Sequence, residues 1–128
     1  MLKKIVSHVH KAHSRLRERH KSGRSHLWDE VRDSHLALHP TCAACGGTES
    51  LQVHHIVPFH VEASRELDPS NLITLCMGER DCHLHVGHGG AFRFYNPDVV
   101  RDALLASASF FRRRARLLAE IRRRRRRD

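Results

Sequence analysis

The sequence lacks the features that would send it out of the cytoplasm or give it a repeat architecture. None of its apolar runs is long enough to cross a bilayer, and its N-terminus has neither the apolar stretch nor the small-residue cleavage site of a signal peptide. No internal repeat is present. A chain of 128 residues can form one domain with extensions and a core of modest size. We therefore expect a cytoplasmic protein with no membrane contact.

Cysteine is scarce, and all four cysteines fall in two pairs: Cys42, Cys45, Cys76 and Cys82. Thiols stay reduced in the cytoplasm, where paired cysteines more often hold a metal than each other. In a secreted protein the same four could form two disulfides, but the close spacing of the first pair favours zinc. The glycines at 46 and 47 permit backbone N–H groups to face sulfur. The alternative for either residue of the second pair is a free buried thiol.

The net charge of +9 is unevenly distributed along the chain. Residues 1–24 carry eight Lys and Arg against one acidic residue, and residues 112–128 carry ten Arg against two acidic residues. Residues 25–111 carry five Arg against eleven Asp and Glu. A polyanion would be held mainly by the basic ends, while the acidic middle supplies the chemistry. The alternative is that the basic ends only aid solubility.

Hydrophobic periodicity and turn residues predict a mixed α and β chain. The expected elements are a basic helical arm over 1–22, a helix over 25–39, strands over 51–57 and 71–75, a loop over 59–70, a helix from 81, and a helix from 96 through 121. Ser25 is the expected cap of the first complete helix. Trp28 is expected to anchor the core, and His60 to be solvated.

Two further groups of side chains carry expectations about packing. His35 and His39 should lie on a solvated face or near a helix C-terminus. The aromatic residues that follow Gly89-Gly90 are expected to pack the last helix onto the core. They are Phe92, Phe94 and Tyr95.

The adjacent histidines His54 and His55 suggest a division of labour in phosphodiester hydrolysis. Neighbouring side chains on a strand point to opposite faces, so one imidazole can bind a cation while the other faces substrate. Near neutral pH an imidazole can deprotonate water, and a bound cation neutralises charge on the phosphate. A helix bearing His83 and His88 would complete the site. The alternative is a structural zinc held by histidines, which would need four protein ligands and no open position.

These motifs, in this order, resemble the HNH endonuclease family, in the branch with a structural four-cysteine zinc site. The resemblance covers roughly residues 25–100. It implies an α+β fold of the ββα-metal (His-Me finger) type with a zinc knuckle and flanking helices. It further implies that His54 binds the metal, that His55 is the general base, and that Asn71 tethers a loop and orients the base.

The same resemblance implies that His83 is a second metal ligand, with a third about one helical turn later. The fourth residue on is Gly87, and His88 is one further; the segment 82–88 resembles a known variant of the family, which favours His88 over His85. The resemblance also implies that the four cysteines hold a structural zinc, although residues 77–81 make the second pair wider than usual. The catalytic cation stays open among Zn²⁺, Ni²⁺, Mn²⁺ and Mg²⁺; imidazoles suit the first three better.

The sequence therefore predicts a metal-dependent endonuclease acting on DNA, with a basic arm over 1–24, a nuclease domain over 25–100, and an Arg-rich helix and tail over 101–128. The alternatives are a non-catalytic zinc-dependent nucleic-acid-binding module and a basic structural protein held together by zinc. Arginines expected to contact phosphate without reading sequence are Arg93, Arg112, Arg113, Arg116, Arg122, Arg123 and Arg124.

Overall fold

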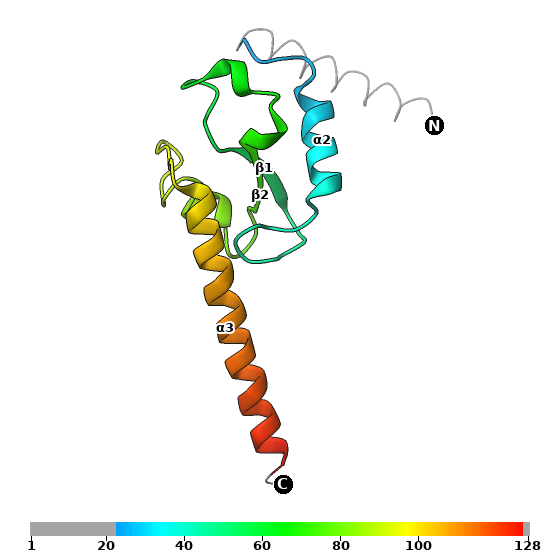
Figure 1. The fold of residues 1–128 in the computed structure, drawn as a ribbon, viewed down its shortest axis with the longest axis vertical. Helices are drawn as coiled ribbons and strands as arrows, with labels where there is room; N and C mark the ends of the chain where they lie inside the picture. Colours follow the sequence, from blue (N-terminus) through cyan, green and yellow to red (C-terminus); the bar gives the residue numbers. More distant parts are fainter. Residues whose placement is uncertain (1–22, 127–128) are drawn as a thin grey trace, which may run out of the picture.

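The computed structural model describes residues 23–126, so the expected basic helix over 1–22 lies outside the described residues. A two-stranded antiparallel hairpin lies between helix α2 on one side and the segment leading into helix α3 on the other (Figure 1). The hairpin and the short helix that follows it give the β-β-α order of an α+β fold. This confirms the fold class predicted from the sequence.

The hairpin consists of β1 (Leu51–His55) and β2 (Leu72–Cys76). Val53 is opposite Thr74, and His54 is opposite Ile73. β1 ends two residues before the predicted strand does. The connection from 56 to 71 contains two short 3₁₀ helices, η1 (Ala63–Arg65) and η2 (Pro69–Asn71), where the sequence predicts only a loop.

Helix α2 (Trp28–Leu38) packs against both strands. It begins three residues later than predicted, and its first turn has no side-chain cap. Ser25 instead accepts a hydrogen bond from Leu27 N at 3.2 Å, before the helix starts. Trp28 is buried with 8% of its surface exposed, as expected of a core anchor. The helix ends before Pro40, which disfavours helical backbone at the preceding residue.

The hydrophobic core is small and lies between the hairpin, the cysteine-bearing turn and the start of α3 (Val99–Arg125). Leu75 of β2 and Val99 of α3 have no exposed surface. All four cysteines belong to the same buried cluster. A core of this size has little apolar area to offset chain entropy, so a bound ion would add to its stability.

Helix α3 contacts the core only through its first turns and then projects away from the body of the molecule (Figure 1). Its 27 residues correspond to about 40 Å at 1.5 Å per residue. Val99 and Ala103 are buried, whereas Leu117 is 61% exposed. Within the described residues, no helix is both long and apolar enough to cross a membrane.

The aromatic residues between η3 (His83–Gly87) and α3 do not pack the last helix onto the core, so that prediction was wrong. Phe92, Phe94 and Tyr95 are 53%, 54% and 40% exposed. Val99 and Ala103 place α3 directly on the core, and Phe92 instead contacts the rings of His83 and His88, at centroid distances of 5.7 and 5.2 Å. His60 is exposed, as predicted.

We expect Leu75→Ala to lower the free energy of unfolding by about 2–5 kcal/mol, because the truncation leaves a cavity in a fully buried position. Leu104→Ala, a matched change at a residue 67% exposed, should change it by no more than about 0.5 kcal/mol. Urea denaturation with zinc in excess measures both values. Equal losses in the two variants would contradict this location of the core.

Candidate metal centres and active site

The four cysteines come from three separate segments of the chain. Cys42 and Cys45 lie on a turn before β1, Cys76 is the last residue of β2, and Cys82 immediately precedes η3. The turn is closed by Gly46 N donating to Cys42 O at 2.8 Å, with Gly46 at φ +73°, where glycine is favoured. Ala43 N donates to Thr74 O at 2.9 Å, which ties the turn to β2.

The sulfur atoms lie close enough to one another to bind a single zinc ion. All four cysteines are free and buried, and their Sγ atoms lie within 4.8 Å of one another. The Sγ atoms of Cys45 and Cys76 are 3.8 Å apart, far beyond a disulfide bond. Four sulfurs at ~2.3 Å from a central zinc would be separated by about 3.8 Å. The donor set therefore fits a structural zinc ion and argues against free thiols with only a packing role.

The protonation of the thiols differs across the cluster. Burial raises the pKa of Cys82 and Cys76 above the usual range for a thiol. Burial also raises the pKa of Cys45, but hydrogen bonds from Gly47 N and the neighbouring thiols outweigh it, so the net pKa is lowered. A zinc ion would bind thiolates, so loading the site releases protons.

Three histidines form a second cluster, separate from the four cysteines. His54 of β1 meets His83 and His88 of the segment around η3, and ligand nitrogens of all three lie within 4.8 Å of one another. Their ring centroids are 4.8–5.1 Å apart and their planes are nearly perpendicular, at 77–88°. Imidazoles that ligate one ion at ~2.1 Å have centroids about 5 Å apart, so this geometry fits a cation.

Hydrogen bonding shows which ring nitrogens are available. His88 Nδ1 lies 2.9 Å from Phe94 O, and a carbonyl only accepts, so Nδ1 carries the proton and Nε2 keeps its lone pair. His83 Nδ1 is buried without a hydrogen-bond partner among the described residues. Burying a polar nitrogen without a partner costs free energy unless an ion or a water molecule binds to it. The cluster thus offers lone pairs without protein donors to satisfy them.

The spacing of His83 and His88 is explained by an unusual helix. η3 is a π-helix, in which His88 N donates to His83 O at 3.1 Å, five residues back. This winding brings residue i+5, rather than i+4, beside residue i. His85 is exposed and lies outside the three-histidine cluster. Because the turn contains one extra residue, His88 and not Gly87 lies beside His83.

Gly87 allows η3 to approach the hairpin. A Cβ at this position would lie 3.1 Å from Leu75 Cδ1 and 3.3 Å from two ring atoms of His54. Those distances are tighter than ordinary contacts, and Gly87 is buried. The absence of a side chain is what permits His54 and η3 to converge, a role that the sequence analysis did not assign.

Burial favours the neutral form of two histidines of the cluster, His54 and His83, by lowering the pKa of each. Desolvation, reinforced by His83, His88 and His55, lowers the pKa of His54 from 6.5 to about 3. Desolvation and then His88 lower the pKa of His83 as well. Neutral imidazoles have the free lone pair that cation binding needs.

His55 points to the other face of β1 from His54. Its ring stacks on Trp28 with centroids 4.5 Å apart and planes at 29°. Its Nε2 lies 2.9 Å from Glu66 O, so Nε2 donates and Nδ1 is left as the basic nitrogen. Burial lowers the pKa of His55, against the opposing effect of the bond to the Glu66 carbonyl. The sequence analysis predicted a core role for Trp28 but not this contact.

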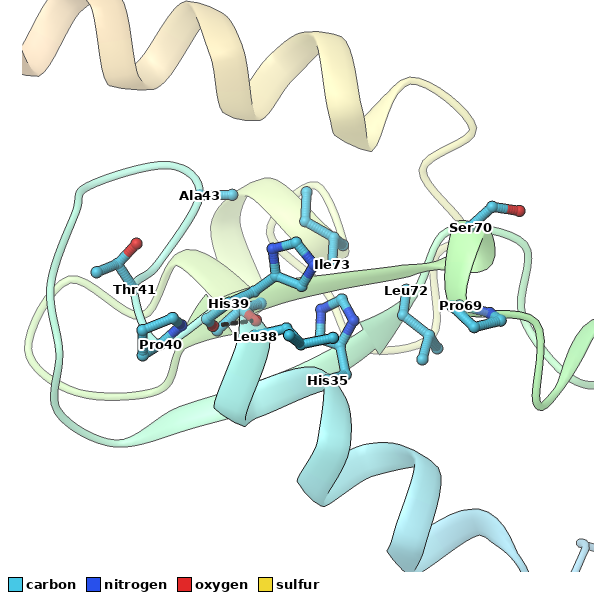
Figure 2. Close-up of a pocket in the computed structure, with 11 residues that line it drawn as sticks. His35, Leu38, His39, Pro40, Thr41, Ala43, Pro69, Ser70, Leu72 and Ile73 are labelled. Carbon is cyan, nitrogen blue, oxygen red and sulfur yellow. Dashed lines mark hydrogen bonds between the residues drawn. The ribbon is translucent and has the colours of Figure 1, made fainter.

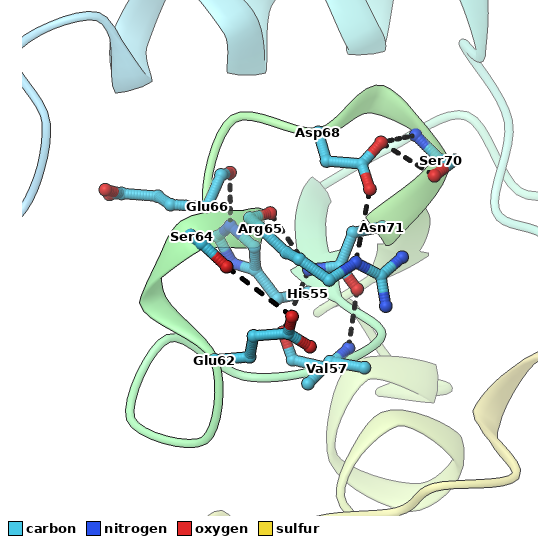
Figure 3. Close-up of polar contacts among 9 residues, drawn as sticks. All are labelled: His55, Val57, Glu62, Ser64, Arg65, Glu66, Asp68, Ser70 and Asn71. Atoms are coloured by element: carbon cyan, nitrogen blue, oxygen red, sulfur yellow. Dashed lines mark hydrogen bonds and ion pairs between the residues drawn. The ribbon is translucent and has the colours of Figure 1, made fainter.

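Asn71 holds the loop that contacts His55 (Figure 3). The side chain is fully buried; Oδ1 accepts from Val57 N at 2.7 Å, and Nδ2 donates to Val57 O at 2.9 Å and Arg65 O at 3.1 Å. Arg65 directly precedes Glu66, whose carbonyl holds the His55 ring. Asn71 therefore reaches His55 through the loop backbone and not by direct contact.

One cavity brings the two functional faces together. It has a volume of about 340 Å³ and is open to solvent, and both adjacent histidines of β1 line it. Its lining residues are Arg24, Val53, His54, His55, Pro58, Phe59, His60, His83 and His88. The cluster that can bind a cation and the imidazole with a free Nδ1 thus border a single space.

A larger cavity of about 480 Å³ lies elsewhere, between the end of α2 and β2 (Figure 2). His35 and His39 line it, with ring centroids 4.5 Å apart. Both lie near the helix C-terminus as predicted, but His35 is only 7% exposed and is not solvated. This cavity contains none of the histidines of the cluster, so its size does not make it the candidate active site.

The arginines expected to contact phosphate lie away from the cavity lining. Arg93 is exposed between η3 and α3, and its Cζ lies 5.2 Å from the Phe94 ring centroid. The other six are exposed along α3: Arg112, Arg113, Arg116, Arg122, Arg123 and Arg124. Glu120 pairs with Arg123 at 3.6 Å and with Arg124 at 3.2 Å. Such exposed pairs are weak and can be exchanged for a phosphate contact.

Comparison with known proteins adds one match. Residues 42–89 match the family of HNH endonucleases. The matched range begins at the first cysteine and ends just after the last histidine of the cluster. No curated protein and no solved structure shows a significant match to the chain.

We expect Cys42→Ser to remove about one equivalent of zinc per chain and to abolish cooperative thermal unfolding, because structural zinc supplies folding free energy directly. Ala43→Ser places the same side chain at an exposed position of the same turn and should keep the zinc. Metal analysis after dialysis, with thiolate-to-cobalt absorption of the Co²⁺ protein, measures the difference. A Cys42→Ser protein that keeps its zinc and melting temperature would contradict the four-cysteine site.

We expect Gly87→Ala to destabilise the protein by about 1–3 kcal/mol and to weaken Ni²⁺ binding by the histidine cluster, because the added Cβ must displace Leu75 or His54. Gly78→Ala is the matched control, since its Cβ would meet only Ser50 at 3.9 Å. Urea denaturation and Ni²⁺ titration of the zinc-loaded proteins test this. The prediction fails if the two alanine variants behave alike.

Proposed function

We propose, from the match of residues 42–89 to the HNH endonuclease family, that this protein is a metal-dependent endonuclease that hydrolyses phosphodiester bonds in DNA. The observation that carries the proposal is the shared cavity: a neutral imidazole with a free Nδ1 borders the same space as three converging imidazoles. A purely structural histidine site would need four protein ligands, and this cluster contains three.

In this proposal His54, His83 and His88 hold the catalytic cation. A divalent ion bound there would neutralise charge on the scissile phosphate and on the leaving oxygen. The all-imidazole donor set favours Zn²⁺, Ni²⁺ or Mn²⁺ over Mg²⁺, which prefers oxygen ligands. The four cysteines hold a separate structural zinc that keeps η3 against β2.

His55 is the proposed general base. Nδ1 takes a proton from a water molecule, the resulting hydroxide attacks phosphorus, and the P–O bond to the leaving oxygen breaks. The Glu66 carbonyl fixes the tautomer by accepting from Nε2, and it also stabilises the imidazolium formed when Nδ1 is protonated. Stacking on Trp28 limits rotation of the ring. Asn71 contributes by fixing the backbone next to Glu66.

Nucleic acid is the proposed partner because the charge distribution suits it. The basic residues of 1–24 and of the Arg-rich segment 101–128 flank an acidic nuclease domain, 25–100. Arginines spread over the exposed surface of α3 suit phosphate contacts that do not read sequence. Phosphate neutralisation by many arginines makes binding steeply dependent on salt.

We expect His55→Ala to lower the rate of plasmid cleavage by roughly 10²–10⁴-fold while DNA binding changes little, because only the proton acceptor is removed. His85→Ala, an imidazole of the same segment outside the cluster, should keep wild-type activity. Single-turnover cleavage and a filter-binding assay separate the two effects. Equal cleavage by wild type and His55→Ala would refute the base, and cleavage by neither would favour a non-catalytic binding module.

The pH profile gives the same experiment a second readout. The base acts in its neutral form, so the rate rises with pH up to the folded-state pKa of His55 and is level above it. Because burial lowers this pKa from 6.5, the acid limb should lie below about pH 6.5. The metal ligand His54 is protonated at still lower pH, near its pKa of about 3, and this protonation should lower the cleavage rate further.

A further inference from the structure

Arg24 lies outside the HNH domain, yet its side chain reaches the histidine cavity. It precedes α2 and lines the cavity together with both histidines of β1. Its Cζ lies 4.8 Å from the ring centroid of Phe59 and 5.5 Å from that of Trp28. The guanidinium is thus held against two aromatic rings, one of which also stacks on His55.

Glu66 fixes the direction of this cation. Arg24 Nε lies 2.9 Å from Glu66 Oε1, and Ser25 N donates to Glu66 Oε2 at 2.9 Å. The Glu66 side chain is only 6% exposed, whereas that of Arg24 is 27% exposed. The contact is an ion pair and not a hydrogen bond, because Glu66 Oε1 has no hydrogen-bond donor among the described residues, so the five N–H donors of the guanidinium are not committed to it. The carboxylate therefore lies behind the cation, with the arginine between it and solvent.

The same residue connects the cation to the proposed base. The Glu66 side chain holds Arg24 while its backbone carbonyl holds His55 Nε2. Burying a carboxylate costs free energy unless it is paired. A hydrophobic residue at this position would stabilise the loop without that cost. Holding an arginine and an imidazole in fixed relation at one cavity is a function that an apolar side chain cannot perform.

We infer that Arg24 binds the phosphate group of the substrate in the histidine cavity, with Glu66 as its positioning residue. This inference rests on the proposed function, since it names a residue for the same site. The planar guanidinium can donate to two phosphate oxygens at once, as a lysine cannot. Charge on those oxygens increases as hydroxide adds to phosphorus, so the contact strengthens along the reaction.

Arg24→Gln tests the inference, with Arg32→Gln as a matched control. Arg32 is also paired with a carboxylate and is 32% exposed, but it does not line the cavity. Both variants are made in the full chain loaded with Zn²⁺ and Ni²⁺. Three readouts are measured for each: single-turnover cleavage of plasmid DNA, filter binding of DNA, and calorimetric binding of inorganic phosphate at high salt, which weakens contacts with α3.

Arg24→Gln is expected to lower the cleavage rate about 10²-fold and to weaken phosphate binding about tenfold, with DNA affinity within about threefold of wild type. The cleavage rate and phosphate affinity of Arg24→Lys should lie between those of wild type and Arg24→Gln. If the melting temperature of Arg24→Gln is below that of Arg32→Gln, a third variant, Arg24→Ala, is assayed with added guanidinium ion. Recovery of DNA cleavage shows a chemical role for the guanidinium, because an added ion does not restore a lost structural contact. Absence of that recovery would overturn the inference.

The two proposals can fail separately. If Arg24→Gln cleaves and binds phosphate as Arg32→Gln does, Arg24 has no role at the phosphate and the endonuclease proposal stands. If wild type does not cleave with any divalent ion, the endonuclease proposal fails, and the phosphate-binding comparison still decides whether Arg24 holds an anion in the cavity.

Discussion

The fold depends on the convergence of four sulfur atoms from three separate segments of the chain. Ten apolar or cysteine residues make up the buried core of the described chain, and four of them are the cysteines themselves. Their packing alone would leave polarisable thiols around a small apolar nucleus. A zinc ion at the centre would join the turn before β1, the end of β2 and the start of η3. Two of these segments lead directly into histidines of the second cluster: β1 carries His54, and η3 begins at His83.

The hairpin separates the two roles proposed for its adjacent histidines by simple geometry. Adjacent side chains on β1 point to opposite faces, so His54 meets η3 and His55 meets Trp28 of α2. In the connection over residues 56–71, the Glu66 carbonyl accepts a hydrogen bond from His55. Asn71 holds that connection in place through its bond to the Arg65 carbonyl. The candidate active site is therefore assembled from layers on both sides of a two-stranded sheet, which explains why so short a domain can contain it.

Much of this arrangement follows from local patterns. Cysteine pairs, adjacent histidines and turn residues predicted the hairpin, the knuckle and the long final helix, because those signals depend on spacing within a few residues. The environments of His35 and of Phe92, Phe94 and Tyr95 were predicted less well. Whether a ring is buried depends on which surface packs above it, and Val99 and Ala103 place α3 directly on the core, where the rings were expected to pack.

The amino-acid sequence is enough to identify the chemical groups: two thiol pairs, two adjacent imidazoles, a loop-tethering asparagine and basic ends around an acidic middle. Tertiary structure alone decided which of these groups meet. The choice between His85 and His88 depended on a π-turn, whose extra residue no periodicity reveals. The contacts of Glu66 with Arg24 and His55 join residues 42 and 11 positions apart, and such pairings are set by the folding of the chain, not by local spacing.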